Sequence, residues 1–224
     1  RRHTRCSRDW SSDVCSSDLT ETPTISLLKQ LKVITSDTNF RSYTLIGSIA
    51  FSSLIIYISN APYLFMTIHG YSSELFSTIF AFNSFALILA SYITPKLVKK
   101  YGDINSMFAA TCLLFLCCSV HFLVVAWSSS VWIEIGLLFS SLMAIGVLFP
   151  ITTANALAPF SEGRGSAAAL MGFSQLMITF LISGVLGFVE ADSILPMVYA
   201  RIVIALVAVF IAYLAYKKIG RAHV

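Results

Sequence analysis

Six long apolar runs constrain this chain more than any other feature of its sequence. They occupy residues 43–65, 75–97, 104–127, 132–156, 165–189 and 194–216, and each is bounded by glycine, proline or charged residues. A hydrocarbon core of roughly 30 Å needs about 20 apolar residues per helical crossing, so each run is long enough to span a bilayer. The sequence therefore predicts an all-α membrane protein in which residues 43–217 form a six-helix transmembrane domain.

The composition agrees with a chain that lies in lipid. Of the 224 residues 57% are hydrophobic and 12% are charged, and the mean hydropathy is +0.80, which excludes an ordinary soluble globule. The formal net charge of +4 does not indicate nucleic-acid binding, because the basic residues lie between apolar runs and form no patch interleaved with aromatic residues. We expect the lipid bilayer as a partner and no nucleic acid.

The basic residues indicate which way the domain is oriented. An even number of spans places both termini on one side, and that side carries eight basic residues against only Arg201 on the other. The eight are Lys29, Lys32, Arg41, Lys96, Lys99, Lys100, Arg164 and Lys217. By the positive-inside rule both termini are cytoplasmic, and residues 20–42 form a cytoplasmic linker as a loop or surface helix.

Both ends of the chain look foreign to the protein. Residues 1–19 are rich in serine, aspartate and arginine, and show neither periodicity nor the features of a targeting peptide. Codons for residues 9–19 and 219–224 can be chosen to match the ends of a common short-read sequencing adapter, which also makes Lys218 doubtful. We expect residues 1–19 and 218–224 to be translated adapter; the alternative is a natural tail at each end.

Polar residues form stripes on the first predicted helix. At 100° per residue, Ser48, Ser52, Ser59 and Tyr63 fall on one stripe, and Ser53, Tyr57 and Asn60 form a neighbouring one. Such a helix favours a polar cavity, and Tyr57, Ser59, Asn60 and Tyr63 are the candidates to line it. Hydrogen bonds between helices of a closed bundle remain the alternative, above all for the serines.

Two amide side chains lie deep in other runs. Asn83 lies about 12 Å into the second run and Gln175 about 15 Å into the fifth, where an unpaired amide is costly. Both are therefore candidates to line the cavity. The seven-residue spacing of Ser77, Ser84 and Ser91 instead predicts a smooth strip for helix packing.

Glycine and proline mark expected contacts and bends. The small residues around Gly165 and Gly172 predict tight helix packing. Pro150 predicts a bend in the fourth helix, where the hydroxyls of Thr152 and Thr153 could satisfy the carbonyls that proline frees.

Ionisable residues in the runs give no clear catalytic or metal site. His121 and Glu134 lie near the ends of the third and fourth runs, where interfacial water could reach them, and Arg201 could pair with Glu190 or Asp192. Cys112, Cys117 and Cys118 share one run, and we expect them to be packing residues. We expect neither a metal nor a cofactor.

An intramembrane enzyme is an alternative from another class. The segment Gly172-Phe173-Ser174 with His121 invites comparison with rhomboid proteases, but Gln175 stands where that pattern has glycine, and its histidine comes later in the chain. The spans also contain no phosphate loop, HExxH motif or paired carboxylates. A channel is a further alternative, without a filter-like loop to support it.

Two segments resemble a transporter family. The run Pro95-Lys96-Leu97-Val98-Lys99-Lys100-Tyr101-Gly102 looks like the cytoplasmic hinge repeated in each half of major facilitator transporters, which makes Gly102 a hinge residue. The segments Asn155-Ala156-Leu157-Ala158-Pro159-Phe160 and Gly165-Ser166-Ala167-Ala168-Ala169-Leu170-Met171-Gly172-Phe173 are similar to the Bcr/CflA drug-resistance branch. The resemblance covers residues 43–216 as helices seven to twelve.

This resemblance implies a carboxy-terminal half of an antiporter that exports small amphipathic drugs against protons across a bacterial inner membrane. Its partners are then the drug, protons and an amino-terminal six-helix half. In such a fold helices seven and ten line the cavity, with eight and eleven beside it and nine and twelve toward lipid. The proton-coupling carboxylates are expected in the other half. A metabolite or sugar exporter is the alternative.

Overall fold

The computed structural model describes residues 27–127, 130–161, 163–187 and 194–220, and in these ranges the chain is helical apart from short connections. Residues 1–19 and 221–224, which we expect to be translated adapter, lie outside the described part. The elements in order are α1 (Leu27–Ser36), α2 (Thr38–Pro62), η1 (Tyr63–Ile68), α3 (Ser73–Tyr101), α4 (Asp103–Ala126), α5 (Val131–Leu157), α6 (Arg164–Gly187) and α7 (Leu195–Gly220).

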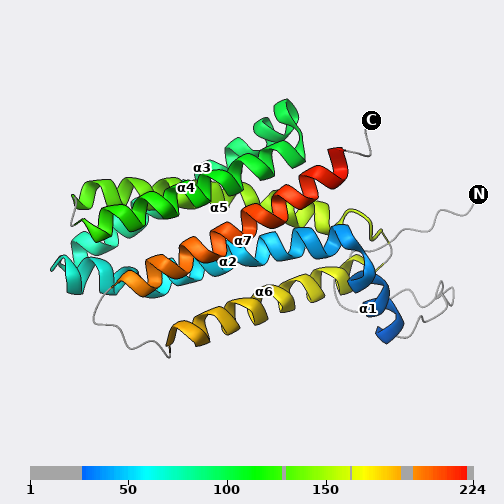
Figure 1. The fold of residues 1–224 in the computed structure, drawn as a ribbon, viewed down its shortest axis with the longest axis horizontal. Coiled ribbons are helices and arrows are strands. Elements are labelled where there is room, and N and C mark those ends of the chain that lie inside the picture. The colour runs from blue at the N-terminus through cyan, green and yellow to red at the C-terminus, as the bar shows by residue number, and fades with distance from the viewer. Residues whose placement is uncertain (1–26, 128–129, 162, 188–193, 221–224) are drawn as a thin grey trace, which may run out of the picture.

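Six of these helical segments are long and apolar enough to cross a membrane, which confirms the all-α fold of six spans. They alternate in direction, as Figure 1 shows. We call the end that holds α1, Gly102 and the end of α7 the near end, and the end that holds η1, Ala126 and Leu195 the far end. The first span begins at Thr38, inside the predicted linker, because Asp37 caps it by accepting a hydrogen bond from the Phe40 amide at 2.7 Å.

The rest of the predicted linker contains α1, a short helix against α2 and α6, as expected for a surface helix. Its Ile34 is 1% exposed, and Ser166 of α6 donates a hydrogen bond to the Gln30 carbonyl oxygen at 3.2 Å. These contacts fix α1 across the near end of the bundle.

The connection between α3 and α4 is shorter than the sequence suggested. Residues 95–101, which belong to the segment that resembles the hinge, continue α3 as helix, and the helix ends at Gly102. Gly102 has φ of +83°, a conformation that side chains with Cβ rarely adopt, and it ends one helix and precedes the next. The turn is thus a single glycine.

The six spans differ in how far they are enclosed. In their most apolar stretches, 61% of residues are buried in α2–η1 and in α5, against 22% in α3 and 11% in α6. Helices α4 and α7 pack against each other and cover α5 and α2, respectively, while α3 flanks α5 and α6 flanks α2. The core therefore lies around α2 and α5.

The central helices approach their neighbours at two glycines. A Cβ atom on Gly146 of α5 would lie 2.5 Å from the Ala90 Cβ of α3. A Cβ on Gly47 of α2 would lie 2.9 Å from the Thr152 hydroxyl of α5. Only glycine allows both approaches without displacement of a neighbour.

The far end of α2 changes its winding. After Pro62 the chain continues as the π-helix η1, and the His69 amide, which caps it, donates to the Leu64 carbonyl at 3.2 Å. Short π-helical segments occur mostly as interruptions of longer helices, often at functional positions.

Candidate functional site

Two of the predicted cavity residues pair with each other inside the bundle. Asn83 of α3 donates from its amide to the Tyr57 hydroxyl of α2 at 3.1 Å, and the two side chains are 0% and 2% exposed. Tyr57 also stacks on Phe80 with ring centroids 6.1 Å apart. The Asn83 carbonyl oxygen has no hydrogen-bond partner. Within this chain the pair therefore faces the interior rather than an open surface.

A second polar cluster surrounds Arg201 of α7. Its guanidinium donates to the Ser141 hydroxyl of α5 at 3.0 Å and to the Ser53 hydroxyl of α2 at 3.3 Å, and the side chain is 1% exposed. Among the described residues no carboxylate lies within 4.0 Å of it. The predicted partners Glu190 and Asp192 lie outside the described residues. Arg201 thus links three helices by hydrogen bonds.

His121 of α4 is more deeply buried than its place near a helix end suggested. It is 2% exposed, and neither ring nitrogen has a hydrogen-bond partner. The expectation of access to interfacial water is therefore wrong for His121, because α7 covers this face of α4.

Ser52, a member of the serine stripe, forms a hydrogen bond with α6, which flanks α2. Ser52 and Thr179 of α6 share a hydrogen bond at 2.9 Å, and both are buried. Gln175, one turn earlier on α6, is half-buried, with its amide nitrogen 3.4 Å from where a Gly47 Cβ would lie. For Ser52, as for Ser53, hydrogen bonding between helices is what the structure shows.

The remaining cavity candidates lie toward the far end of α2. Ser59 is exposed, while Asn60 and Tyr63 are half-buried. The Asn60 amide bonds only to its own helix, at the Ile56 carbonyl, 2.9 Å away. The structure therefore brings Tyr57 and Asn83 together, whereas Gln175 lies on the opposite flank of α2. A cavity shared by all these residues stays a prediction.

The glycines and the proline have different surroundings from those expected. A Cβ on Gly165 or Gly172 would meet no atom of this chain within 4 Å, so the tight contacts form elsewhere, at Gly47 and Gly146. Helix α5 continues through Pro150, and the Thr152 hydroxyl bonds to the Leu148 carbonyl at 2.8 Å rather than to the Gly146 carbonyl that proline frees.

The pair of His69 and Glu134 was missed at the sequence level. The His69 Nε2 lies 3.0 Å from a Glu134 carboxylate oxygen, and the Glu134 residue is only 4% exposed. Access of Glu134 to interfacial water was therefore a wrong expectation, because the residue is buried against His69. The available signal was a carboxylate in a run of apolar residues, which rarely stays buried without a partner.

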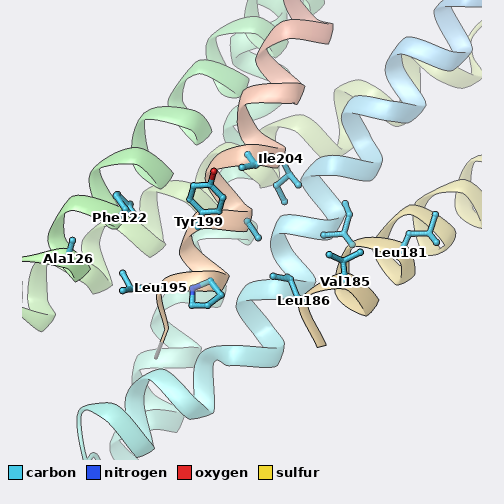
Figure 2. A pocket seen from close by; sticks show the side chains of 12 residues that line it. Phe122, Ala126, Leu181, Val185, Leu186, Leu195, Tyr199 and Ile204 are labelled. Carbon is cyan, nitrogen blue, oxygen red and sulfur yellow. The ribbon is translucent and has the colours of Figure 1, made fainter. Parts of the chain in front are cut away.

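An apolar groove of about 920 Å³ lies between the far ends of α4, α6 and α7. Figure 2 shows Tyr199 and Leu195 of α7 between Phe122 on one side and Leu186 on the other. None of the predicted cavity residues lines it, and among the described residues Tyr199 is the only ionisable group in its walls. Its walls suit a hydrocarbon environment and do not extend the polar site.

The described residues contain no group of three His, Cys, Asp or Glu side chains that could hold a metal ion. What the bundle does contain is polar pairs between helices, distributed around α2 and α5. Such groups can bind and release polar solutes or protons when the helices move, but they do not form a nucleophile with a base.

Comparison with known proteins identifies the family. The family model of the Major Facilitator Superfamily matches residues 12–182. This range begins inside residues 1–19, so it gives no support to an adapter origin for that whole segment. No solved structure gave a significant match.

The curated relatives include proteins named for drug resistance. "Multidrug resistance protein MdtL" of Shewanella sp. (strain ANA-3) is 27% identical over 162 residues, which are 69% of this chain and 39% of that protein. "Bicyclomycin resistance protein homolog" of Haemophilus influenzae is 24% identical over 183 residues, 75% of this chain and 43% of that protein. "Uncharacterized MFS-type transporter YdgK" of Bacillus subtilis is 24% identical over 175 residues, which are 75% of this chain and 42% of that protein.

The chain thus spans about two fifths of the length of the curated relatives it matches. The match to the family model covers more than half of the chain, and the six spans have the architecture of one half of that fold. The chain is an integral membrane protein that belongs to the Major Facilitator Superfamily, a family of transporters rather than enzymes.

Proposed function

We propose that this chain is the carboxy-terminal half, helices seven to twelve, of a Bcr/CflA-type exporter that moves small amphipathic drugs out of a bacterial cell in exchange for protons. One observation carries the proposal: a six-helix bundle of this superfamily aligns with about two fifths of relatives named for drug resistance. Under this proposal α2 and α5 are the helices nearest the transport cavity.

Two surfaces on the flanking helices support the presence of a partner half. On α3 the strip of Ser77, Ala81 and Ser91 is exposed, and on α6 Gly165, Ala168 and Ala169 are exposed. Small residues allow helix backbones to approach closely, and these two strips are exposed in the described chain. They are suited to contact helices of an amino-terminal half.

The charge distribution supports the proposed orientation. All eight basic residues counted in the sequence lie at the near end, whereas at the far end the described part has Arg201, which is buried, and the acids Glu74 and Glu134. The near end is then cytoplasmic and the far end external, in the inner membrane.

We further propose that Ser59, Asn60, Tyr63 and Gln175 line the cavity, with the Tyr57–Asn83 pair behind them. Ser59 is exposed and the other three are half-buried, so they are accessible from outside this half. In the complete transporter without Cys112, Cys117 and Cys118, cysteines at Ser59, Asn60, Tyr63 and Gln175 should react with a water-soluble thiol reagent, whereas a cysteine at the buried position of Asn83 should react far more slowly. Protection of a cysteine by a drug would support contact with the substrate. If none of the first four cysteines reacts, the assignment of these residues to the cavity is wrong.

Transport itself gives the decisive experiment. The chain alone should not export drug from vesicles, because alternating access needs two halves around a site between them. Co-expression with the amino-terminal half should restore drug resistance and proton-dependent efflux. Competition by a sugar or metabolite, but not by drugs, would favour the other exporter class. Proton-dependent drug efflux by the purified chain alone would show that the half-transporter proposal is wrong.

The foreign origin of residues 1–19 and 218–224 also remains a proposal. It is supported by the match between possible codons and adapter sequence at both ends. Amplification of the locus from genomic DNA without adapters should give other codons at both positions. Genomic codons for both tails as printed would contradict the proposal.

A further inference from the structure

The far end of the bundle contains an ion-pair contact that the proposed function does not use. His69 caps η1, and its Nε2 contacts a carboxylate oxygen of Glu134 in the first turn of α5 at 3.0 Å. The Glu134 side chain is 5% exposed and that of His69 is 18% exposed. The contact therefore joins the last turn of the first span to the beginning of the fourth.

The surroundings of the pair leave Glu134 dependent on His69. The imidazole stacks on Tyr71, with ring centroids 5.9 Å apart, and lies 6.4 Å from the Phe65 ring. Tyr71 is the other titratable group beside the imidazole, and Glu74 at the start of α3 is exposed to solvent. Within the described residues, His69 is the only basic group within 4.0 Å of the Glu134 carboxylate.

The charge of the pair changes with one proton. When His69 is protonated, the contact is an ion pair in which the imidazolium balances the buried carboxylate. When His69 is neutral, the buried carboxylate keeps only a hydrogen bond and loses its countercharge, which makes its burial less favourable. Histidine is the side chain that ordinarily makes this change near neutral pH.

The segment that carries His69 departs from regular α-helix on both sides of the contact. It follows Pro62, winds as a π-helix, and is followed by Gly70 with φ of +67°. A Cβ on Gly70 would meet no atom within 4 Å, so there is open space beside this residue, while the next residue, Tyr71, packs against the core. Leu64 and Phe65 of η1 are buried in the apolar core. The polar link from this end of the first span to α5 is the His69–Glu134 contact.

We propose that His69 and Glu134 form a proton-binding latch. A proton on His69 holds η1 against α5, and loss of that proton releases η1 so that water can reach Glu134. On the proposed function, on which this direction rests, the far end is external. Protons that arrive from outside after drug release would then favour closure of the external mouth. The pair stays at the far end, so its proton regulates the cycle and is not the one transported.

The latch can be tested without transport. Spin labels at Thr67 on η1 and Ile133 on α5, both exposed, report the distance between the two sides in the full chain in nanodiscs, with its own cysteines replaced. Between about pH 5 and pH 8 the population with the long label separation, relative to the population with the short separation, should rise about tenfold in the wild type. Glu74→Gln, an exposed acid at the same end, is the matched control and should keep this response.

The pair itself is tested by conservative variants. Glu134→Gln and His69→Gln should each abolish the pH response, and the exchange His69→Glu with Glu134→His should restore at least part of it. A pH-independent distance in the wild type, or a full response in Glu134→Gln, would overturn the latch. A normal latch response in a protein that exports no drug would reject the proposed function and leave the latch intact.

Discussion

The two flanking spans, α3 and α6, occupy equivalent places but are held differently. Each lies beside one central helix, α3 beside α5 and α6 beside α2. Helix α3 meets α5 at Gly146, where the backbones approach closely, and it bonds to α2 through Asn83 and Tyr57. Helix α6 is attached to α2 by the Ser52–Thr179 hydrogen bond and has little contact with α5 or α7.

The difference shows that the hydropathy of a span does not determine how firmly the span is attached to its neighbouring helices. The apolar stretches of α3 and α6 have mean hydropathies of 1.7 and 1.8, yet 22% of one and 11% of the other is buried. Between helices in lipid the attraction comes from close packing and hydrogen bonds, because lipid chains are as apolar as leucine. A glycine contact and a buried amide therefore attach α3 to the central helices more firmly than one hydroxyl pair attaches α6 to them.

The largest expected effect comes from the glycine contact. Gly146→Ala should lower the free energy of unfolding by about 2–3 kcal/mol, because its Cβ would overlap Ala90 and force the helices apart. Unfolding by heat or SDS in detergent micelles measures it. Gly136→Ala on the same helix and Gly172→Ala on α6 meet open space and should cost little. Adding Ala90→Gly should recover most of the loss; equal costs at Gly146 and Gly172 would contradict the comparison.

A smaller effect is expected at the buried amide. Tyr57→Phe removes the hydroxyl that accepts from Asn83, so the amide loses its one observed side-chain partner, at a cost of about 1–2 kcal/mol. The same unfolding assay applies. Tyr63→Phe, at a half-buried tyrosine on the same span, is the control. If Tyr57→Phe is neutral while Asn83→Leu is costly, packing rather than the hydrogen bond attaches α3.

The smallest effect should be the coupling that holds α6. A double-mutant cycle of Ser52→Ala and Thr179→Val should give about 0.6 kcal/mol, the usual size for a hydrogen bond between membrane helices. Ser48→Ala with Thr179→Val is a suitable control cycle, because Ser48 bonds only within its own helix. A coupling larger than the Tyr57→Phe effect would reverse the comparison between the two flanks.

Part of the candidate site could be predicted from the sequence and part could not. The deep amide of Asn83 and the polar stripe of Tyr57 pointed to buried polar contacts, and both residues take part in one. The partners of Arg201 and Glu134 could not be found, because Ser53, Ser141 and His69 are distant in the chain and common in type. A hydrogen bond between helices leaves no local pattern in either segment.

The sequence by itself determined the number of spans, their approximate limits and the charge difference between the two ends, because each depends on the transfer of one local segment from water to lipid. Only the packing of the helices shows that the close contacts within this chain lie at Gly47 and Gly146, and that Gly165 and Gly172 face open space in it. The packing also decided which polar groups are paired. Inside a membrane a polar group must find its partner on a neighbouring helix, and only the packing of the helices selects that neighbour.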